Sequence, residues 1–291
     1  MSNIINDRLN FTDCIQTNKI LGELYSVNKD PFGNEILKFV ATNTVTVSGV
    51  YSLFKNLLSD YGDNVDITYE PETINSILGI NSTGINIPDT PASIVLFGVS
   101  DGGATDTFGT VYKPDVRQTT LYHSEGNTDT IIPMRRTAEE IDLNQYYMRR
   151  PVADTDGTVD YFLKKIKGVS IKTLSKNPSG DEGSEYAGTD EITPSTSDNI
   201  SPIVSFMEFT LELTEDDIRE YYEASNAAPA ATKYNTLGLF TGKLANVGTD
   251  DEGNPMYDYV DVRLFSAITF DNKSLRTTSS GVYKYRIYGI V

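Results

Sequence analysis

The chain of 291 residues has no tryptophan, one histidine and one cysteine, Cys14. A single cysteine forms no disulfide within the chain, and it leaves a cysteine-based zinc site short of ligands. The sequence therefore predicts neither a disulfide-built secreted protein nor a zinc centre, and Cys14 is interpreted as a small apolar core residue. The single histidine, His123, excludes a histidine-rich metal site.

Long apolar runs are missing as well. The longest fall far below the roughly 18 residues that a membrane helix needs, so no membrane partner is expected. Residues 1–20 lack the basic segment followed by an apolar segment that marks a signal peptide. These absences predict a soluble, intracellular protein.

Positive charge is scarce: 24 lysines and arginines stand against 41 aspartates and glutamates, for a net charge of -17. Such an acidic surface repels phosphate backbones, so no nucleic-acid partner is expected. Tyrosine, in contrast, is abundant, with 18 residues. Its ring packs while its hydroxyl stays hydrated, which suits half-buried strand positions and contact surfaces.

Short runs rich in valine, isoleucine, threonine and aromatic residues, separated by turn residues, predict strands along most of the chain. The clearest are residues 93–99, 158–167, 203–213, 235–244, 255–270 and 282–291. The regular alternation of strand and helix that builds a doubly wound nucleotide fold is absent. The sequence predicts an α+β, β-rich fold of mostly antiparallel sheets, sandwich-like or barrel-like, with two or three short helices and one long flexible arm.

Helical segments are few and short. Residues 48–58 place apolar side chains at helical spacing behind Ser48, a plausible N-cap. Residues 71–80 and 214–225 also indicate short helices, and Thr137 and Glu140 have the spacing of a capping box at the start of residues 137–150. Residues 174–202 contain almost no large apolar side chain and predict the arm. The domain prediction for residues 1–291 is one β-rich domain or two closely packed subdomains.

The glycines of residues 98–109 raise the question of a phosphate-binding loop. The lysine followed by serine or threonine that such a loop requires is missing, and Asp101 and Asp106 add negative charge where a phosphate would bind. We interpret Gly98, Gly102 and Gly103 as parts of a loop between strands, where glycine permits a positive φ and close approach of backbones.

Other candidate sites are weaker. His123 follows a predicted strand with no nucleophile motif in the chain, and we interpret it as structural. Asp154, Asp156 and Asp160 faintly resemble a calcium loop, but the position that should hold a glutamate is Lys165, so an acidic turn is favoured. The sequence predicts no catalytic residue, no cofactor site and no metal site, and it does not indicate an enzyme.

Basic residues gather in one region of this acidic chain. The candidate interface residues are Arg135, Arg136, Arg149, Arg150, Lys164 and Lys165, with Lys167 close by. Arginine pairs bidentately with carboxylates and is favoured at interfaces, so one hypothesis is contact with an acidic surface on a neighbouring subunit. The alternative is pairing within the chain, with Glu139, Glu140, Asp142 and nearby acids.

Several segments, taken in order, resemble virion structural proteins of tailed bacteriophages, of the neck, tail and baseplate kind. They are residues 39–58 and 94–109, residues 131–150 and 158–167, and the closing residues 261–291. The first two follow a pattern of strand, short helix and apolar strand ending in a glycine turn. The glycine spacing is matched loosely, because Val99, Ser100 and Asp101 precede Gly102 and Gly103.

The resemblance implies a non-enzymatic structural subunit, present in many copies in a ring or layer of the particle. Its implied partners are other copies of itself and other virion structural proteins, and its implied location is the virion, assembled in the host cytoplasm. A capsid-decorating or fibre-attachment protein is the structural alternative. The other classes that remain open are a receptor- or carbohydrate-binding β-module and, with less support, a hydrolase with unrecognised carboxylates.

Overall fold

The structure, a computed structural model, describes most of the chain. The described residues are 22–60, 66–104, 111–112, 114, 117–121, 131–139, 141–142, 144–176, 182–185, 203–214, 216–224, 233–250, 252–274 and 281–289. Cys14, His123 and most of the predicted arm 174–202 lie outside them. Within that arm, residues 174–176 end one strand and Glu182–Glu185 form another.

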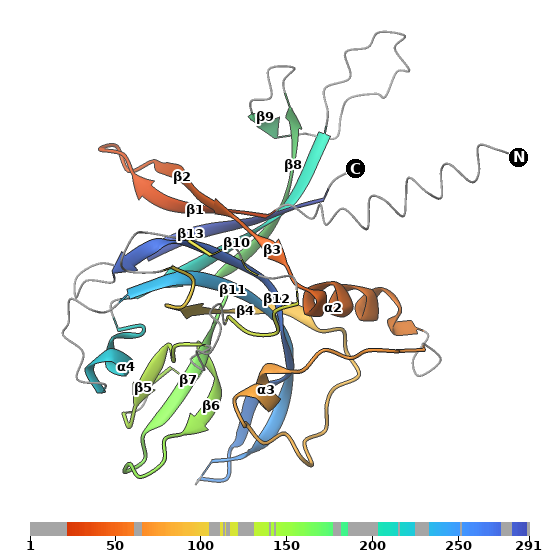
Figure 1. Ribbon diagram of the computed structural model, residues 1–291, viewed down its shortest axis with the longest axis vertical. Helices are drawn as coiled ribbons and strands as arrows, with labels where there is room; N and C mark the ends of the chain where they lie inside the picture. Colours follow the sequence, from red (N-terminus) through yellow and green to blue (C-terminus); the bar gives the residue numbers. More distant parts are fainter. Residues whose placement is uncertain are drawn as a thin grey trace, which may run out of the picture.

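One antiparallel sheet has six strands in the order β2-β1-β13-β10-β8-β9. Its strands are β1 (Gly22–Lys29), β2 (Glu35–Thr42), β8 (Gly168–Lys176), β9 (Glu182–Glu185), β10 (Ile203–Leu213) and β13 (Gly281–Gly289). The strand β2 forms one edge of this sheet, and the β1–β2 hairpin extends away from the rest of the molecule (Figure 1).

The second antiparallel sheet has seven strands, in the order β3-β12-β11-β4-β7-β5 with β6 also paired to β7. They are β3 (Thr44–Val45), β4 (Ser93–Ser100), β5 (Arg135–Thr137), β6 (Tyr146–Pro151), β7 (Val159–Lys165), β11 (Lys233–Thr249) and β12 (Pro255–Ser274). The hairpin of β11 and β12 contains four register shifts, and the two long strands bend strongly (Figure 1). Bulges of this kind increase the local twist and let a sheet curve.

The two sheets face each other across a shared apolar core. Alternate residues of β10 point into it, with Phe209, Leu211 and Leu213 all at 2% exposure or less. Tyr285 of β13 and Leu239 of β11 are fully buried in the same core. The alternation in residues 209–213 therefore has the physical origin expected of a strand with one buried face. Phe206 and Glu208, on the opposite face of the strand, are also buried, at 3% and 5% exposure.

Three short helices complete the described structure: α2 (Val47–Leu57), α3 (Ile74–Ile77) and α4 (Arg219–Ala224). The predicted β-rich, mostly antiparallel fold with short helices is confirmed. The predicted N-cap of α2 is wrong, since Thr46, not Ser48, accepts the hydrogen bond from Gly49 N. The cap is displaced because Thr46 is also tied to β12, where its hydroxyl donates to the Leu264 carbonyl at 2.6 Å.

The predicted helix over residues 137–150 is wrong. Thr137 ends β5, and Tyr146 begins β6, which pairs with β7 through Tyr147 and Leu163. The capping-box spacing is a local signal only. The Thr137 hydroxyl instead accepts from Glu139 N in a turn, and pairing with a distant strand outweighs the local preference.

Of the three glycines interpreted as a loop, Gly98 lies within β4, and Gly102 and Gly103 lie in the turn that follows it. Gly98 lies opposite Gly238 in the sheet, where an added Cβ would be 2.7 Å from Leu163 Cδ2. On Gly103 a Cβ would be 2.2 Å from Thr236 Oγ1, whereas Gly102 has no such close neighbour. The expectation of positive φ is wrong for all three, and the close approach at Gly98 and Gly103 is to side chains and not to backbone.

Candidate functional site

The helix α2 lies on β12 through its small residues. Its buried positions are Ser48, Gly49 and Ser52. At Gly49 the approach is so close that an added Cβ would lie 2.1 Å from the Phe265 carbonyl oxygen. The Ser52 hydroxyl accepts a hydrogen bond from Thr241 of β11 at 3.2 Å, so the inward face of the helix is small and polar.

The apolar face of α2 consequently points away from the protein. Leu53, Phe54, Leu57 and the C-cap residue Leu58 are 36%, 43%, 70% and 39% exposed, respectively. An amphipathic helix ordinarily turns its apolar stripe toward the core. A stripe that stays exposed while small residues make the internal contact is typical of a surface that binds a partner.

This arrangement predicts that Gly49→Ala lowers stability. In an ordinary helix the change from glycine to alanine stabilises by about 1 kcal/mol. Here the new Cβ meets backbone that cannot rotate aside, so we expect a net loss of about 1–2 kcal/mol. Chemical denaturation followed by circular dichroism measures this change, with Val47→Ala on the exposed face as the control. A more stable Gly49→Ala protein would contradict the packing described.

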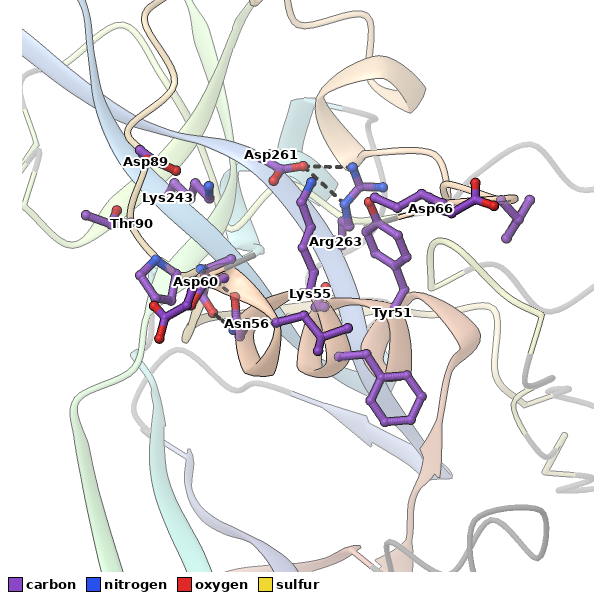
Figure 2. Close-up of a pocket in the computed structure, with 18 of the residues that line it drawn as sticks. Tyr51, Lys55, Asn56, Asp60, Asp66, Asp89, Thr90, Lys243, Asp261 and Arg263 are labelled. Atoms are coloured by element: carbon purple, nitrogen blue, oxygen red, sulfur yellow. Dashed lines mark hydrogen bonds and ion pairs between the residues drawn. The ribbon is translucent and has the colours of Figure 1, made fainter. Parts of the chain in front are cut away.

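A groove of about 810 Å³ opens between the end of α2 and the strands β11 and β12 (Figure 2). Phe54 and Leu58 of the helix contribute to its lining, as do Ile67 and Tyr69 of the following segment, which are 46% and 61% exposed. The lining also carries charges of both signs, from Lys55, Asp60, Asp66, Asp89, Lys243, Asp261 and Arg263. The groove is therefore apolar at the helix and mixed in charge along its floor.

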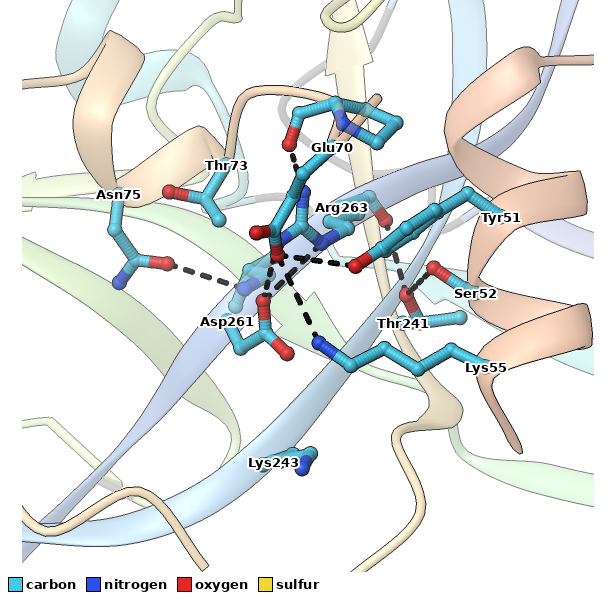
Figure 3. A network of polar contacts seen from close by, with 12 residues as sticks. Tyr51, Ser52, Lys55, Glu70, Thr73, Asn75, Thr241, Lys243, Asp261 and Arg263 are labelled. Carbon is cyan, nitrogen blue, oxygen red and sulfur yellow. Dashed lines mark hydrogen bonds and ion pairs between the residues drawn. The ribbon is translucent and has the colours of Figure 1, made fainter. Parts of the chain in front are cut away.

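Arg263 of β12 organises this floor (Figure 3). Its side chain is 4% exposed and contacts Asp261 at 2.8 Å and Glu70 at 2.7 Å. It also donates to the Pro71 carbonyl, and its guanidinium lies 5.0 Å from the centre of the Tyr51 ring. These contacts tie the segment before α3 to β12 and compensate the charge of Arg263 within the chain.

The two lysines of the groove differ in their partners. Lys55 pairs with Glu70 at 3.7 Å. Burial lowers the pKa of Lys55, but the Tyr51 hydroxyl and the carboxylates of Asp261 and Glu70 outweigh this and raise it above its ordinary value. Lys243 donates to the Pro88 carbonyl at 3.1 Å, and among the described residues its ammonium makes no ion pair. Both lysines lie on the groove's lining (Figure 2).

The predicted interface residues lie elsewhere, mainly on β5, β6 and β7, and most are paired within the chain. Arg135 binds Glu220 at 2.7 Å, and Arg136 binds Asp160 at 2.6 Å. The remaining pairs are Arg149 with Asp258, Arg150 with Asp160 and Lys164 with Asp217. Lys165 is exposed and makes no ion pair in the described part of the chain. These partner acids come from distant segments, and neither Glu139 nor Asp142 is among them, while Glu140 lies outside the described residues.

No metal centre is found in the described residues, where no three histidine, cysteine, aspartate or glutamate side chains gather around one point. Of the acids in residues 154–160, Asp160 is 1% exposed and bound to two arginines. Asp154 lies in a turn with φ 60°. Among the helices described, none has the length and apolar character needed to cross a membrane.

Sequence reasoning did not find the groove, because its lining comes from three separated parts of the chain. One signal was present: small residues at positions 48, 49 and 52 share a helical face opposite the apolar stripe. Comparison with protein-family models, with curated proteins and with solved structures finds no match. The function is therefore argued from this geometry and from the pattern of the sequence.

Proposed function

We propose that the protein is a non-catalytic assembly subunit, present in multiple copies in the neck, tail or baseplate of a tailed bacteriophage particle. The observation that carries the self-assembly is the exposed apolar face of α2 beside the groove. The assignment to a phage particle rests on the pattern of the sequence segments, and its partners are then other copies of this chain and other virion proteins.

The physical argument concerns the cost of leaving this face in water. Full burial of an exposed leucine or phenylalanine is worth about 1.5–3 kcal/mol. The residues of this face are 36–70% exposed, so each forgoes the corresponding part of that amount. Gly49 and the serines already hold the helix on the sheet, so the fold does not need the apolar stripe for its own packing. Burial against another subunit removes that cost, and the net charge of -17 keeps the free chain soluble until it assembles.

The test is the substitution Leu57→Asp. Because the side chain is 70% exposed in the isolated chain, we expect unfolding stability to change by less than about 0.5 kcal/mol. A charge placed in an apolar interface is costly, so we expect self-association to weaken by more than tenfold. Light scattering and electron microscopy of wild type and variant measure this difference.

The matched control is Thr155→Asp, an added acid in the exposed turn between β6 and β7. We expect this variant to assemble as the wild type does. Equal loss of assembly in both variants would mean that added charge alone is responsible. Unchanged assembly of Leu57→Asp would contradict the role assigned to α2, and a wild-type chain that never self-associates would contradict the proposed function.

A further inference from the structure

A second exposed apolar feature lies at the tip of the β1–β2 hairpin. The tip reads Asp30, Pro31, Phe32, Gly33 and Asn34, and Phe32 is 90% exposed. The Asp30 carboxylate accepts hydrogen bonds from Phe32 N and Asn34 N, both at 2.8 Å, and from the Asn34 side chain. Gly33 takes the positive φ of 88° that closes the turn. The ring of Phe32 is thus presented on a rigid support.

The same turn occurs again between β11 and β12, which shows that phenylalanine is not needed to form it. There Asp250 accepts from Glu252 N at 3.0 Å and from Asn254 N at 2.7 Å, and Gly253 has φ 87°. The position equivalent to Phe32 is occupied by Glu252, which is exposed to solvent. One chain therefore builds this turn twice, once with an acid at the tip and once with an aromatic ring. The turn itself leaves Phe32 unexplained.

Among the described strands, none pairs with the outer side of the hairpin behind the tip. Strand β2 is an edge strand, and its Ile36 and Phe39 are 50% and 52% exposed. Tip and strand together offer an apolar projection with charges of both signs, from Lys29, Asp30, Glu35 and Lys38. Natural edge strands usually avoid such exposed apolar side chains unless another chain covers them.

We propose that the hairpin tip of one copy inserts into the α2 groove of the next, with Phe32 packed against Phe54 and Tyr69. The two features lie on opposite sides of the molecule, so they cannot meet within one chain (Figure 1). A projection and a groove on opposite sides form a head-to-tail contact, which closes into a ring or continues as a filament. This inference rests on the proposed function and names the joint that it uses.

The chemistry of the two surfaces matches. The groove's volume of about 810 Å³ exceeds that of a single phenylalanine ring, so the flanking residues of the tip enter as well. Hydrogen bonds from Asn34 hold the pKa of Asp30 below its ordinary value. The hairpin tip therefore carries a charged carboxylate close to the Phe32 ring. Lys243 supplies the opposite charge, since Lys55 already pairs with Glu70 within the chain, and the exposed Asp60 and Asp89 are available to the hairpin's lysines.

Cross-linking between mixed single-cysteine variants tests the joint. Each protein carries Cys14→Ser, and one population adds Lys29→Cys beside the tip while the other adds Ser59→Cys on the groove's lining, so Phe32 and Phe54 stay in place. A short bismaleimide is applied to each population alone and to their mixture. We expect covalent dimers in the mixture and little product from either population alone, because the contact joins two different surfaces. The matched control replaces Lys29→Cys by Thr249→Cys, the equivalent position before the turn between β11 and β12, and we expect no dimer.

The variant Phe32→Glu gives a second readout without cysteines. The turn between β11 and β12 already accepts glutamate at this position, so the fold should be retained while self-association weakens by more than tenfold. Dimers of Lys29→Cys with itself, equal yields with Thr249→Cys, or full assembly of Phe32→Glu would overturn the joint. If the wild type assembles in such a case, the proposed function stands; if the wild type stays monomeric, both proposals fall.

Discussion

Asp217→Ala is expected to lower the free energy of unfolding by about 3–5 kcal/mol. Asp217 is fully buried and binds the Lys164 ammonium at 2.7 Å. It also accepts from the Tyr146 hydroxyl at 2.8 Å and from Thr214 N at 2.7 Å. Alanine leaves a lysine that is only 5% exposed without a counter-charge, together with two donors that have lost their acceptor.

A double variant distinguishes the effect of the uncompensated lysine charge from the effect of the lost side-chain volume. Adding Lys164→Met to Asp217→Ala removes the uncompensated charge, so we expect the double variant to regain a substantial part of the lost stability. Urea unfolding at one protein concentration and neutral pH measures Asp217→Ala, Lys164→Met and the double variant. Two results would contradict the description of this cluster. One is a double variant whose loss of unfolding free energy equals the sum of the losses in the two single variants. The other is an Asp217→Ala protein whose stability lies within about 0.5 kcal/mol of wild type.

The second large effect is loss of stability at alkaline pH. Burial raises the pKa of Tyr234, Tyr283 and Tyr285 above the ordinary value, and it raises the pKa of Tyr259 to about 12. In the unfolded chain tyrosine titrates near pH 10, so above that pH the native state holds more protons than the unfolded state. Stability is complete below about pH 10 and falls as the pH rises, by about 1.4 kcal/mol per pH unit for each such tyrosine.

The control for this prediction is Tyr285→Phe. Tyr285 is fully buried, and its hydroxyl shares a hydrogen bond of 2.7 Å with Ser266. The variant loses that bond but has one tyrosine fewer to deprotonate on unfolding. Between pH 10 and 11 its stability should fall by about 1 kcal/mol less than that of wild type, because the unfolded tyrosine is only half ionised at pH 10. Equal slopes would show that Tyr285 does not contribute, and circular dichroism is the suitable probe because the chain has no tryptophan.

The strands were predictable wherever one face is buried along its whole length. In β10 the residues Phe209, Leu211 and Leu213 point into the core, while Glu208 and Glu212 lie on the opposite face. The same alternation of apolar and polar residues is visible in the sequence of the strand. Residues 137–150, which contain the end of β5 and most of β6, were mistaken for a helix, since their pairing with β7 depends on residues about 10 to 22 positions further along the chain.

The basic cluster shows where prediction from local spacing ends. Sequence proximity indicated Glu139, Glu140 and Asp142 as acids for the arginines, but the structure supplies Glu220 from α4 and Asp258 from β12. Carboxylates so far away in sequence are brought close only by the sheet topology. Pairing within the chain therefore accounts for most of these charges, and the proposed joint is placed on the α2 groove instead.

The groove was hidden for a similar reason. The helix was recognised by its apolar spacing, but the direction in which it faces depends on the contact between Gly49 and Phe265, which are far apart in sequence. Phe32, in contrast, was visible as an aromatic residue in an Asp-Pro-Phe-Gly turn. Only comparison with the matching turn at Asp250 shows that the turn does not require a phenylalanine at this position.

The mass of the wild-type chain in solution tests the central claim most directly. Sedimentation equilibrium over a wide range of concentrations, at neutral pH and moderate salt, gives that mass without a surface or a label. Head-to-tail self-assembly predicts a mass that rises with concentration from the 32.1 kDa of one chain to its multiples. A single species of 32.1 kDa at every concentration would contradict the account.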